Sequence, residues 1–113
     1  TMDESKNFER NRRVVQALKD AGADFKKEHA IEHHIYCYTE SDFNQIVTLG
    51  TENGYTVAND GQYEDDEGVY WQLDLIYKST PDIASIEKQS IEIEHIVESS
   101  NADYDGWGTE VQK

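Results

Sequence analysis

Near its start the chain reads Ala30-Ile-Glu-His-His-Ile-Tyr-Cys-Tyr38, a run in which alternate residues differ in kind. Successive side chains of a β-strand point to opposite faces, so every second residue shares a face. The odd-numbered residues Ile31, His33, Ile35 and Cys37 would then face a core, and the even-numbered ones would face away from it. We therefore expect a strand with one buried face.

The hydrophobic pattern changes period several times along the chain. We expect helices over residues 4–21, 39–54 and 81–98, and strands over residues 29–38, 55–58 and 69–77 and from Ala102 onward. Thr39 and Asp42 have the spacing of a helix cap, and Thr80-Pro81 predicts a cap followed by proline at the first helical position. Asn59-Asp-Gly61 predicts a turn and Asp105-Gly106 predicts a bulge.

This order predicts an α+β fold, a ferredoxin-like βαββαβ sandwich with an additional N-terminal helix. A length of 113 residues allows one domain. Residues 4–28 would form the N-terminal helix and its connector, and residues 29–113 the ferredoxin-like part. The N-terminal helix would cover part of the sheet face that the two later helices leave open. That face would carry Glu32, His34, Tyr36, Tyr38, Tyr70, Gln72, Asp74 and Ile76.

Charge is divided unevenly along the chain. Residues 1–27 hold seven basic and five acidic residues, a net charge of +2, whereas residues 28–113 hold three basic and nineteen acidic residues, a net charge of −16. A negative field of this size repels phosphate, so we expect no direct binding of nucleic acid. It favours a basic protein segment as the partner, although solubility alone is an equally simple reason for the charge.

Tyrosines on the open sheet face invite comparison with RNA recognition motifs, which stack bases on aromatic rings of a similar sheet. The basic and aromatic signature of those motifs is missing here. We therefore interpret Tyr36, Tyr38 and Tyr70 as a protein-contact surface, with ordinary cross-strand packing as the alternative.

The residues that could hold a metal or perform catalysis are poorly spaced for either. On a strand, His29 and His33 would lie about 13 Å apart, too far to share one ion. The acidic run Glu64-Asp-Asp-Glu67 lacks the spacing of a calcium-binding loop, and no nucleophile or phosphate-binding motif occurs. We expect no metal, no cofactor and no enzymatic activity; an enzyme, if there were one, would use paired carboxylates such as Asp103 and Asp105.

Cys37 is the single cysteine of the chain, which excludes an internal disulfide. Its place in an apolar strand predicts a buried, inert thiol. No apolar run approaches the ~20 residues that a membrane-spanning helix needs. We therefore expect no membrane contact and a cytoplasmic location.

Two segments together resemble a known family: Ile31-Glu-His-His34 followed by a helix, and Tyr104-Asp-Gly-Trp-Gly-Thr109 at the end. With the weaker Gly54-Tyr-x-Val57 between them, residues 29–110 are similar to the regulator of ribonuclease activity B family. The resemblance implies a non-catalytic, ferredoxin-like protein that binds the arginine-rich scaffold region of ribonuclease E and modulates RNA turnover. Known members carry an acidic C-terminal tail, whereas this chain has an acidic loop at residues 59–68.

We therefore expect an acidic protein-binding regulator whose partner is a basic segment of a ribonuclease E-like endoribonuclease. The electrostatic surface would comprise Glu32, Glu64, Asp65, Asp66, Glu67, Asp74, Asp103 and Asp105. Trp107 would be an apolar anchor if it is exposed, and a core residue otherwise. The alternatives are a small enzyme or ligand-binding domain that uses the acidic sheet face, or a homodimer that buries this face. We expect a monomer or a weak homodimer.

Overall fold

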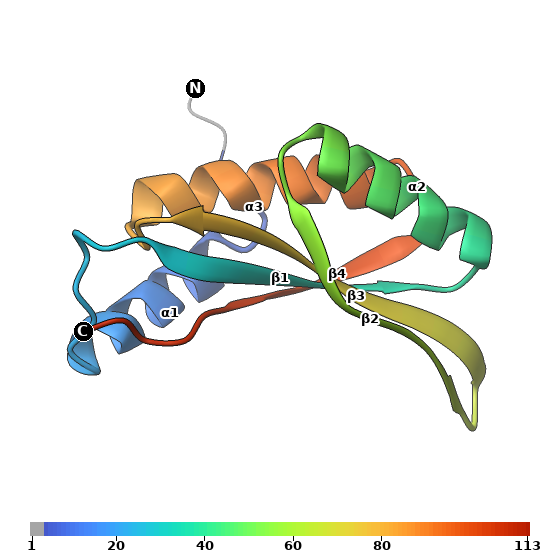
Figure 1. Ribbon diagram of the computed structural model, residues 1–113, viewed down its shortest axis with the longest axis horizontal. Helices are drawn as coiled ribbons and strands as arrows, with labels where there is room; N and C mark the ends of the chain where they lie inside the picture. Colours follow the sequence, from blue (N-terminus) through green and yellow to red (C-terminus); the bar gives the residue numbers. More distant parts are fainter. Residues whose placement is uncertain (1–3) are drawn as a thin grey trace.

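The computed structural model describes residues 4–113 as a four-stranded sheet with its helices on one side (Figure 1). Its elements are α1 Phe8–Asp20, β1 His29–Cys37, α2 Glu40–Glu52, β2 Thr56–Asp65, β3 Gly68–Ser79, α3 Ile83–Glu98 and β4 Ala102–Gly108. The strand order is β2-β3-β1-β4, and every neighbouring pair is antiparallel. The predicted α+β fold of ferredoxin-like topology with an N-terminal helix is confirmed.

The core lies between the sheet and helices α2 and α3. Ile35 and Leu75, on the central strands β1 and β3, are fully buried, as are Ile46 of α2 and Ile93 of α3. Helix α2 approaches the sheet closely at Gly50, where an added Cβ would lie 2.7 Å from the Cδ2 atom of Leu75. A larger residue at this position would push α2 away from the sheet.

The helix starts were predicted with mixed success. The Thr39 side chain accepts a hydrogen bond from the Asp42 amide at 3.1 Å, which confirms the predicted cap of α2. The predicted cap of α3 at Thr80 is wrong: the helix begins at Ile83 and its cap is Asp82, which accepts from the Ser85 amide at 3.1 Å. The carboxylate of Asp82 also accepts from the Thr80 hydroxyl, so Thr80 supports the cap instead of forming it.

The β2–β3 hairpin is longer than the sequence predicted. Asn59 adopts a φ of 52°, and the strand register shifts between Ala58 and Gly61. The predicted turn at residues 59–61 is therefore a bulge inside a continuous strand, because a residue in the left-handed conformation absorbs one extra position without ending the pairing. The predicted acidic loop is the end of this hairpin, with Glu64 and Asp65 in β2 and only residues 66–67 in the turn.

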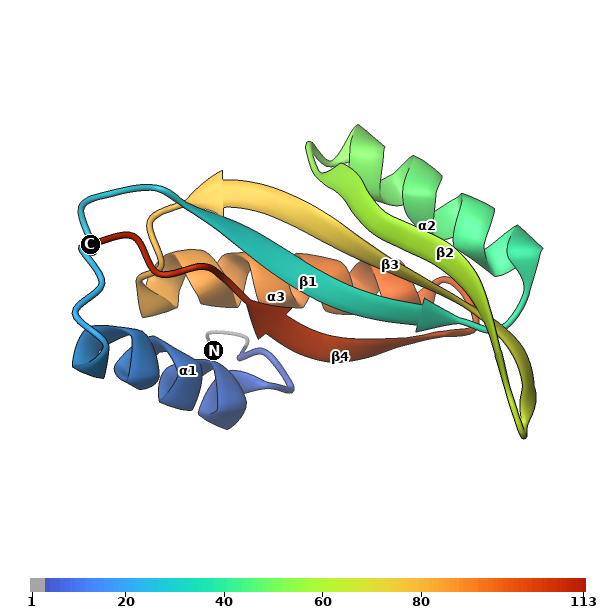
Figure 2. The ribbon, with the colours of Figure 1, turned by 60° about the horizontal axis from the view of Figure 1, so that its bottom comes forward.

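Helix α1 does not cover the open sheet face, which corrects that expectation. It lies on the same side of the sheet as α3 and beside β4 (Figure 2). Val15 and Leu18 of α1 pack with Ile31, Ile86 and Trp107 in a second core cluster. An apolar helix stripe gains free energy only against apolar surface, and the open face is polar.

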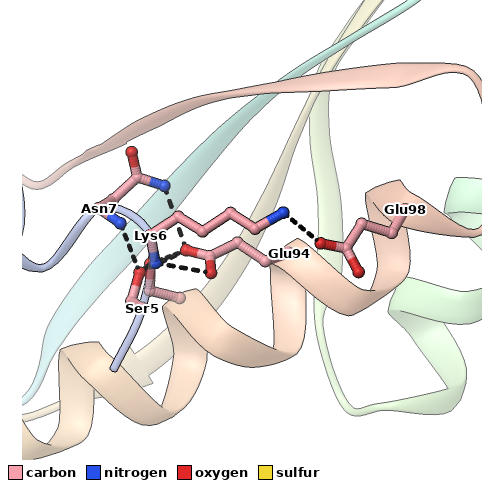
Figure 3. A network of polar contacts seen from close by, with 6 residues as sticks. Ser5, Lys6, Asn7, Glu94 and Glu98 are labelled. Atoms are coloured by element: carbon pink, nitrogen blue, oxygen red, sulfur yellow. Dashed lines mark hydrogen bonds and ion pairs between the residues drawn. The ribbon is translucent and has the colours of Figure 1, made fainter. Parts of the chain in front are cut away.

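Buried polar contacts hold the start of α1 against α3 (Figure 3). The Glu94 carboxylate, on α3, accepts hydrogen bonds from the Lys6 amide at 3.0 Å, from Asn7 Nδ2 at 3.1 Å and from the hydroxyl of Ser5. The dipole of α1 also favours the negative charge of Glu94 beside the N-terminal end of that helix. The exposed Lys6–Glu98 ion pair, 2.6 Å long, lies outside this buried group.

Asn11 links α1 to both of its neighbours. Its Nδ2 donates to Glu87 of α3 at 2.8 Å, and its Oδ1 accepts from the indole nitrogen of Trp107, on β4, at 2.9 Å. Trp107 is only 7% exposed. Trp107 is therefore the core residue that the sequence allowed as the alternative, and it offers no anchor to a partner.

His33 is a hydrogen-bonded core histidine, as predicted. Its Nε2 lies 2.8 Å from the Gln89 side-chain oxygen, which only accepts, so Nε2 carries the proton. Its Nδ1 then accepts from the Tyr104 hydroxyl at 2.7 Å. Burial lowers the pKa of His33 to about 4, only partly opposed by the Gln89 hydrogen bond. The imidazole is thus a neutral structural group.

We predict that Glu94→Ala destabilises the protein by about 2 kcal/mol, because the Lys6 amide and the Asn7 side chain lose their acceptor. Urea unfolding measures the loss, and hydrogen exchange should show faster exchange of the Lys6 amide. Glu98→Ala is the matched control on the same helix. It removes only an exposed ion pair and should leave the unfolding free energy unchanged within error. Equal effects of the two substitutions would contradict this account.

A second prediction concerns pH. The folded pKa of His33, about 4, lies below its ordinary value of 6.5, so the unfolded chain binds a proton first as pH falls. The stability that neutral His33 contributes is fully present above about pH 6.5 and decreases toward pH 4. Between about pH 7.5 and pH 5.5 the free energy of unfolding should fall by about 1 kcal/mol. Urea unfolding at the two pH values should show this loss, and His33→Gln should reduce it. His95→Gln, at an exposed position of α3, should not.

Candidate protein-binding surface

The open face is the side of the sheet that no helix covers. Register places on it the even-numbered residues of β1 and β3 and the residues paired with them on the edge strands. From β4 it gains Asp103, which pairs with Tyr36; from β2 it gains Asp65 and also Tyr63, which pairs with Tyr70. Its polar and aromatic members are Glu32, His34, Tyr36, Tyr38, Thr56, Tyr63, Asp65, Tyr70, Gln72, Asp74, Lys78, Asp103 and Asp105.

The structure brings most of the expected acidic residues to this face or its rim. Asp65, Asp103 and Asp105 are exposed, and Glu32 is half-buried. Asp66 and Glu67 form the tip of the β2–β3 hairpin, which extends away from the helices (Figure 1). Glu64 alternates with its neighbour Asp65 and so points to the other side of the hairpin.

Asp74 differs from the other carboxylates of this face because it is only 5% exposed, with both of its oxygens hydrogen-bonded. One oxygen accepts from His34 Nδ1 and the other from Asn59 Nδ2, both at 2.7 Å. The charge of Asp74 would therefore attract a partner protein without direct contact with the carboxylate. His34 lies on the open face as expected, where it is bound to Asp74.

Tyrosine rings form a row across three strands of the open face. The Tyr36 and Tyr70 rings are 6.0 Å apart between centroids, and Tyr70 stacks on Tyr63 at 5.7 Å. Sequence reasoning missed Tyr63, because the bulge at Asn59 reverses which residues of β2 face outward. If residues 56–65 had been treated as one strand with one extra residue between Ala58 and Gly61, Tyr63 would have been predicted on the open face.

Tyr36 and Tyr38 have raised pKa values, so these two residues add no charge to the face. Burial, together with the nearby charges of Asp105 and Asp74, raises the pKa of Tyr36. Tyr38 donates its hydroxyl proton to a hydrogen bond with Asp103, and this bond is the main cause that raises the pKa of Tyr38 to about 12. The face therefore combines aromatic rings with acidic side chains.

A cavity of about 440 Å³ lies elsewhere, at the end of β3 and the start of α3. The side chains of Gln89 and Ser79 in its wall are hydrogen-bonded to each other at 2.8 Å. Two acidic and two basic residues also line it, namely Glu28, Glu92, Lys78 and Lys88. It does not belong to the acidic face that a ligand-binding or enzymatic alternative would use.

Two groups that could serve in catalysis, Cys37 and His33, are buried in the core, whereas Asp103 and Asp105 are exposed on β4. Burial raises the pKa of the Cys37 thiol to about 11, which matches the expected inert residue. Within residues 4–113, no group of three His, Cys, Asp or Glu side chains could hold a metal ion. No helix in the same range is long and apolar enough to span a membrane.

The two sequence segments that suggested a family lie side by side in the structure. Glu32 pairs with Gly108 and His33 with Trp107, across β1 and β4. Gly106 has a φ of 84° and makes the bulge predicted there, with a side-chain nitrogen of Arg10 3.0 Å from where its Cβ would be. These segments form the contact between the sheet and α1. Their similarity to a family is therefore evidence about the fold before it is evidence about a binding surface.

Comparison with known proteins confirms the family resemblance that the two segments suggested. Residues 8–109 match the family model described as "Regulator of ribonuclease activity B". Proteins of that name are similar over most of the chain. The protein from Shewanella denitrificans is 29% identical, covering 90% of this chain and 80% of its own length, and that from Pseudoalteromonas atlantica is 27% identical, covering 96% and 94%. The protein from Shewanella amazonensis is 30% identical, covering 89% and 72%. The chain therefore belongs to the regulator of ribonuclease activity B family.

Proposed function

We propose that this protein regulates RNA turnover by binding a basic, arginine-rich segment of a ribonuclease E-like endoribonuclease through its open face. The observation that carries the proposal is that Asp65, Asp103 and Asp105 are exposed on one side of the sheet, Asp65 on β2 beside the acidic hairpin tip and the other two on β4, with Asp74 on β3 between these strands. Carboxylates gathered on one face attract a cationic chain more strongly than the same charges spread evenly.

The distribution of basic residues supports the same surface. Most of the lysines and arginines lie in residues 1–27, and α1 is on the helix side of the sheet. Arg10 and Arg12 are engaged in ion pairs with Asp105 and Glu9, at 3.8 Å and 2.9 Å. Register places one basic residue, Lys78, on the open face, and Arg10 reaches Asp105 at its rim, so the acidic residues of this face still outnumber the basic ones. The same charge would make two copies of this face repel each other, which argues against a homodimer formed through it.

A regulatory role by binding, without chemistry, fits the state of the reactive groups. His33 has both ring nitrogens occupied within the core, and Cys37 is buried with a raised pKa. Bound in this way, the protein would cover part of the endoribonuclease that otherwise contacts RNA or other proteins. The proposal places the protein in the cytoplasm, together with its partner.

The proposal predicts that the triple variant Asp65→Asn, Asp103→Asn, Asp105→Asn binds the endoribonuclease about tenfold more weakly at low salt, because three interface charges are lost. Asparagine keeps the size of each side chain and can still accept the Tyr38 hydrogen bond. Surface plasmon resonance measures affinity, and an RNA cleavage assay with increasing amounts of the protein measures regulation.

The control variant removes three exposed carboxylates that lie elsewhere: Asp20→Asn, Glu52→Gln and Glu110→Gln. It has the same net charge as the open-face variant and should bind nearly as well as the wild type. Raising salt from about 50 to about 300 mM should weaken wild-type binding more than binding by the open-face variant. If both variants lose affinity equally, net charge and not the open face is responsible, and the proposed surface is wrong.

A further inference from the structure

We propose that the open face selects arginine over lysine, by stacking guanidinium groups on the row formed by Tyr36, Tyr70 and Tyr63. The inference rests on the proposed function, and it goes further by naming the side chain that the surface recognises. Charge alone would treat the two basic residues alike, so the tyrosines and not the carboxylates would supply the selectivity.

The first argument is the accessibility and state of the rings. Tyr63 is 44% exposed, and Tyr70 and Tyr36 are half-buried. The stacked pair Tyr63–Tyr70 has an interplanar angle of 23°, and Tyr36 continues the row at 55°. Aromatic rings at such partly exposed positions attract cations through the negative charge of the ring.

The second argument is that carboxylates flank this row. Asp103 is paired with Tyr36 across β1 and β4, and Asp65 is two residues from Tyr63 on the same side of β2. A guanidinium group is planar, so it can stack on a ring and still donate two hydrogen bonds to a carboxylate at its edge. A lysine ammonium is a strongly hydrated point charge, and it loses more hydration when it approaches a ring.

The spacing of the rings indicates the shape of the partner. The centroids are 6.0 Å and 5.7 Å apart along the row. Alternate side chains of an extended peptide lie about 7 Å apart on one side of its backbone. An extended segment laid across the strands, with arginine at every second position, would therefore place successive guanidinium groups over successive rings.

Two other occupants fit less well. Single-stranded RNA also stacks on aromatic rings, but the surrounding carboxylates repel its phosphates. A second copy of this chain would have to present its basic residues from α1, where they follow helical spacing and include the paired Arg10 and Arg12. Both remain outcomes that the experiment can detect.

The test uses two fluorescent peptides of equal length and charge, one with arginine and one with lysine at alternate positions separated by glycine. Fluorescence anisotropy with the full chain at low salt measures both affinities. We expect the wild type to bind the arginine peptide about threefold to tenfold more tightly than the lysine peptide, the factor expected for one or two exposed ring–cation contacts.

Variants then separate the rings from the charge. Tyr36→Leu with Tyr70→Leu should bring the affinity ratio near one, with the lysine peptide bound about as before because every carboxylate remains. Tyr36→Phe with Tyr70→Phe keeps the rings and should keep the arginine preference. Tyr77→Leu is the matched control, since Tyr77 is 42% exposed and its register with Ile31 puts it on the other face. Circular dichroism confirms that each variant is folded.

The outcomes distinguish this inference from the proposed function. Equal affinity of the wild type for both peptides, or an arginine preference that survives in the Leu variant, overturns the selection by tyrosine. In either case the carboxylate variants can still weaken binding to the endoribonuclease, and the proposed function stands. Binding of a single-stranded RNA oligonucleotide that depends on Tyr36 and Tyr70 would show that the row serves nucleobases, and it would also overturn the inference. Failure of every variant to change endoribonuclease binding removes the proposed function itself.

Discussion

The whole arrangement depends on β1, because this strand is central in the sheet and has two different faces. Ile31, His33, Ile35 and Cys37 are fully buried, whereas the even-numbered residues that alternate with them point away from the helices. A shift of its register by one residue would place the apolar side chains in water and Glu32 and Tyr36 in the core. Because one face of β1 must be buried against the helices, its other face, with acidic residues and tyrosine, stays on the side that no helix covers.

The position of α1 preserves that availability. Trp107 and Asn11 join the helix to β4, and Glu87 and Glu94 join its start to α3. These contacts are long-range in sequence and at least partly buried, so they are costly to break. They keep the basic N-terminal part of the chain on the helix side, and the charge asymmetry along the sequence becomes an asymmetry between two sides of the molecule.

Much of the fold could be predicted from local patterns. The alternation in β1, the Thr39 cap and the bulge at Gly106 each depend on residues close together in the chain, and all three are confirmed. The start of α3 was predicted at Thr80 instead of Asp82, because two neighbouring residues can both cap a helix and only the folded geometry selects one. The true length of β2 was missed for a related reason: Asn59 in isolation is typical of a turn, and pairing with β3 makes it a bulge.

The candidate surface, too, was predicted in part from the sequence and was completed only by the tertiary structure. By itself the sequence determined the acidic charge, the placement of Glu32, Tyr36 and Asp74 on the outward faces of their strands, and the family resemblance, since composition and alternation are properties of the chain. Only the tertiary structure decided that Trp107 is buried, that Asp74 is held by His34 and Asn59, that Tyr63 joins the tyrosine row, and that α1 leaves this face uncovered. Each of these depends on contacts between distant segments, and such contacts are chosen by which surfaces can be buried together.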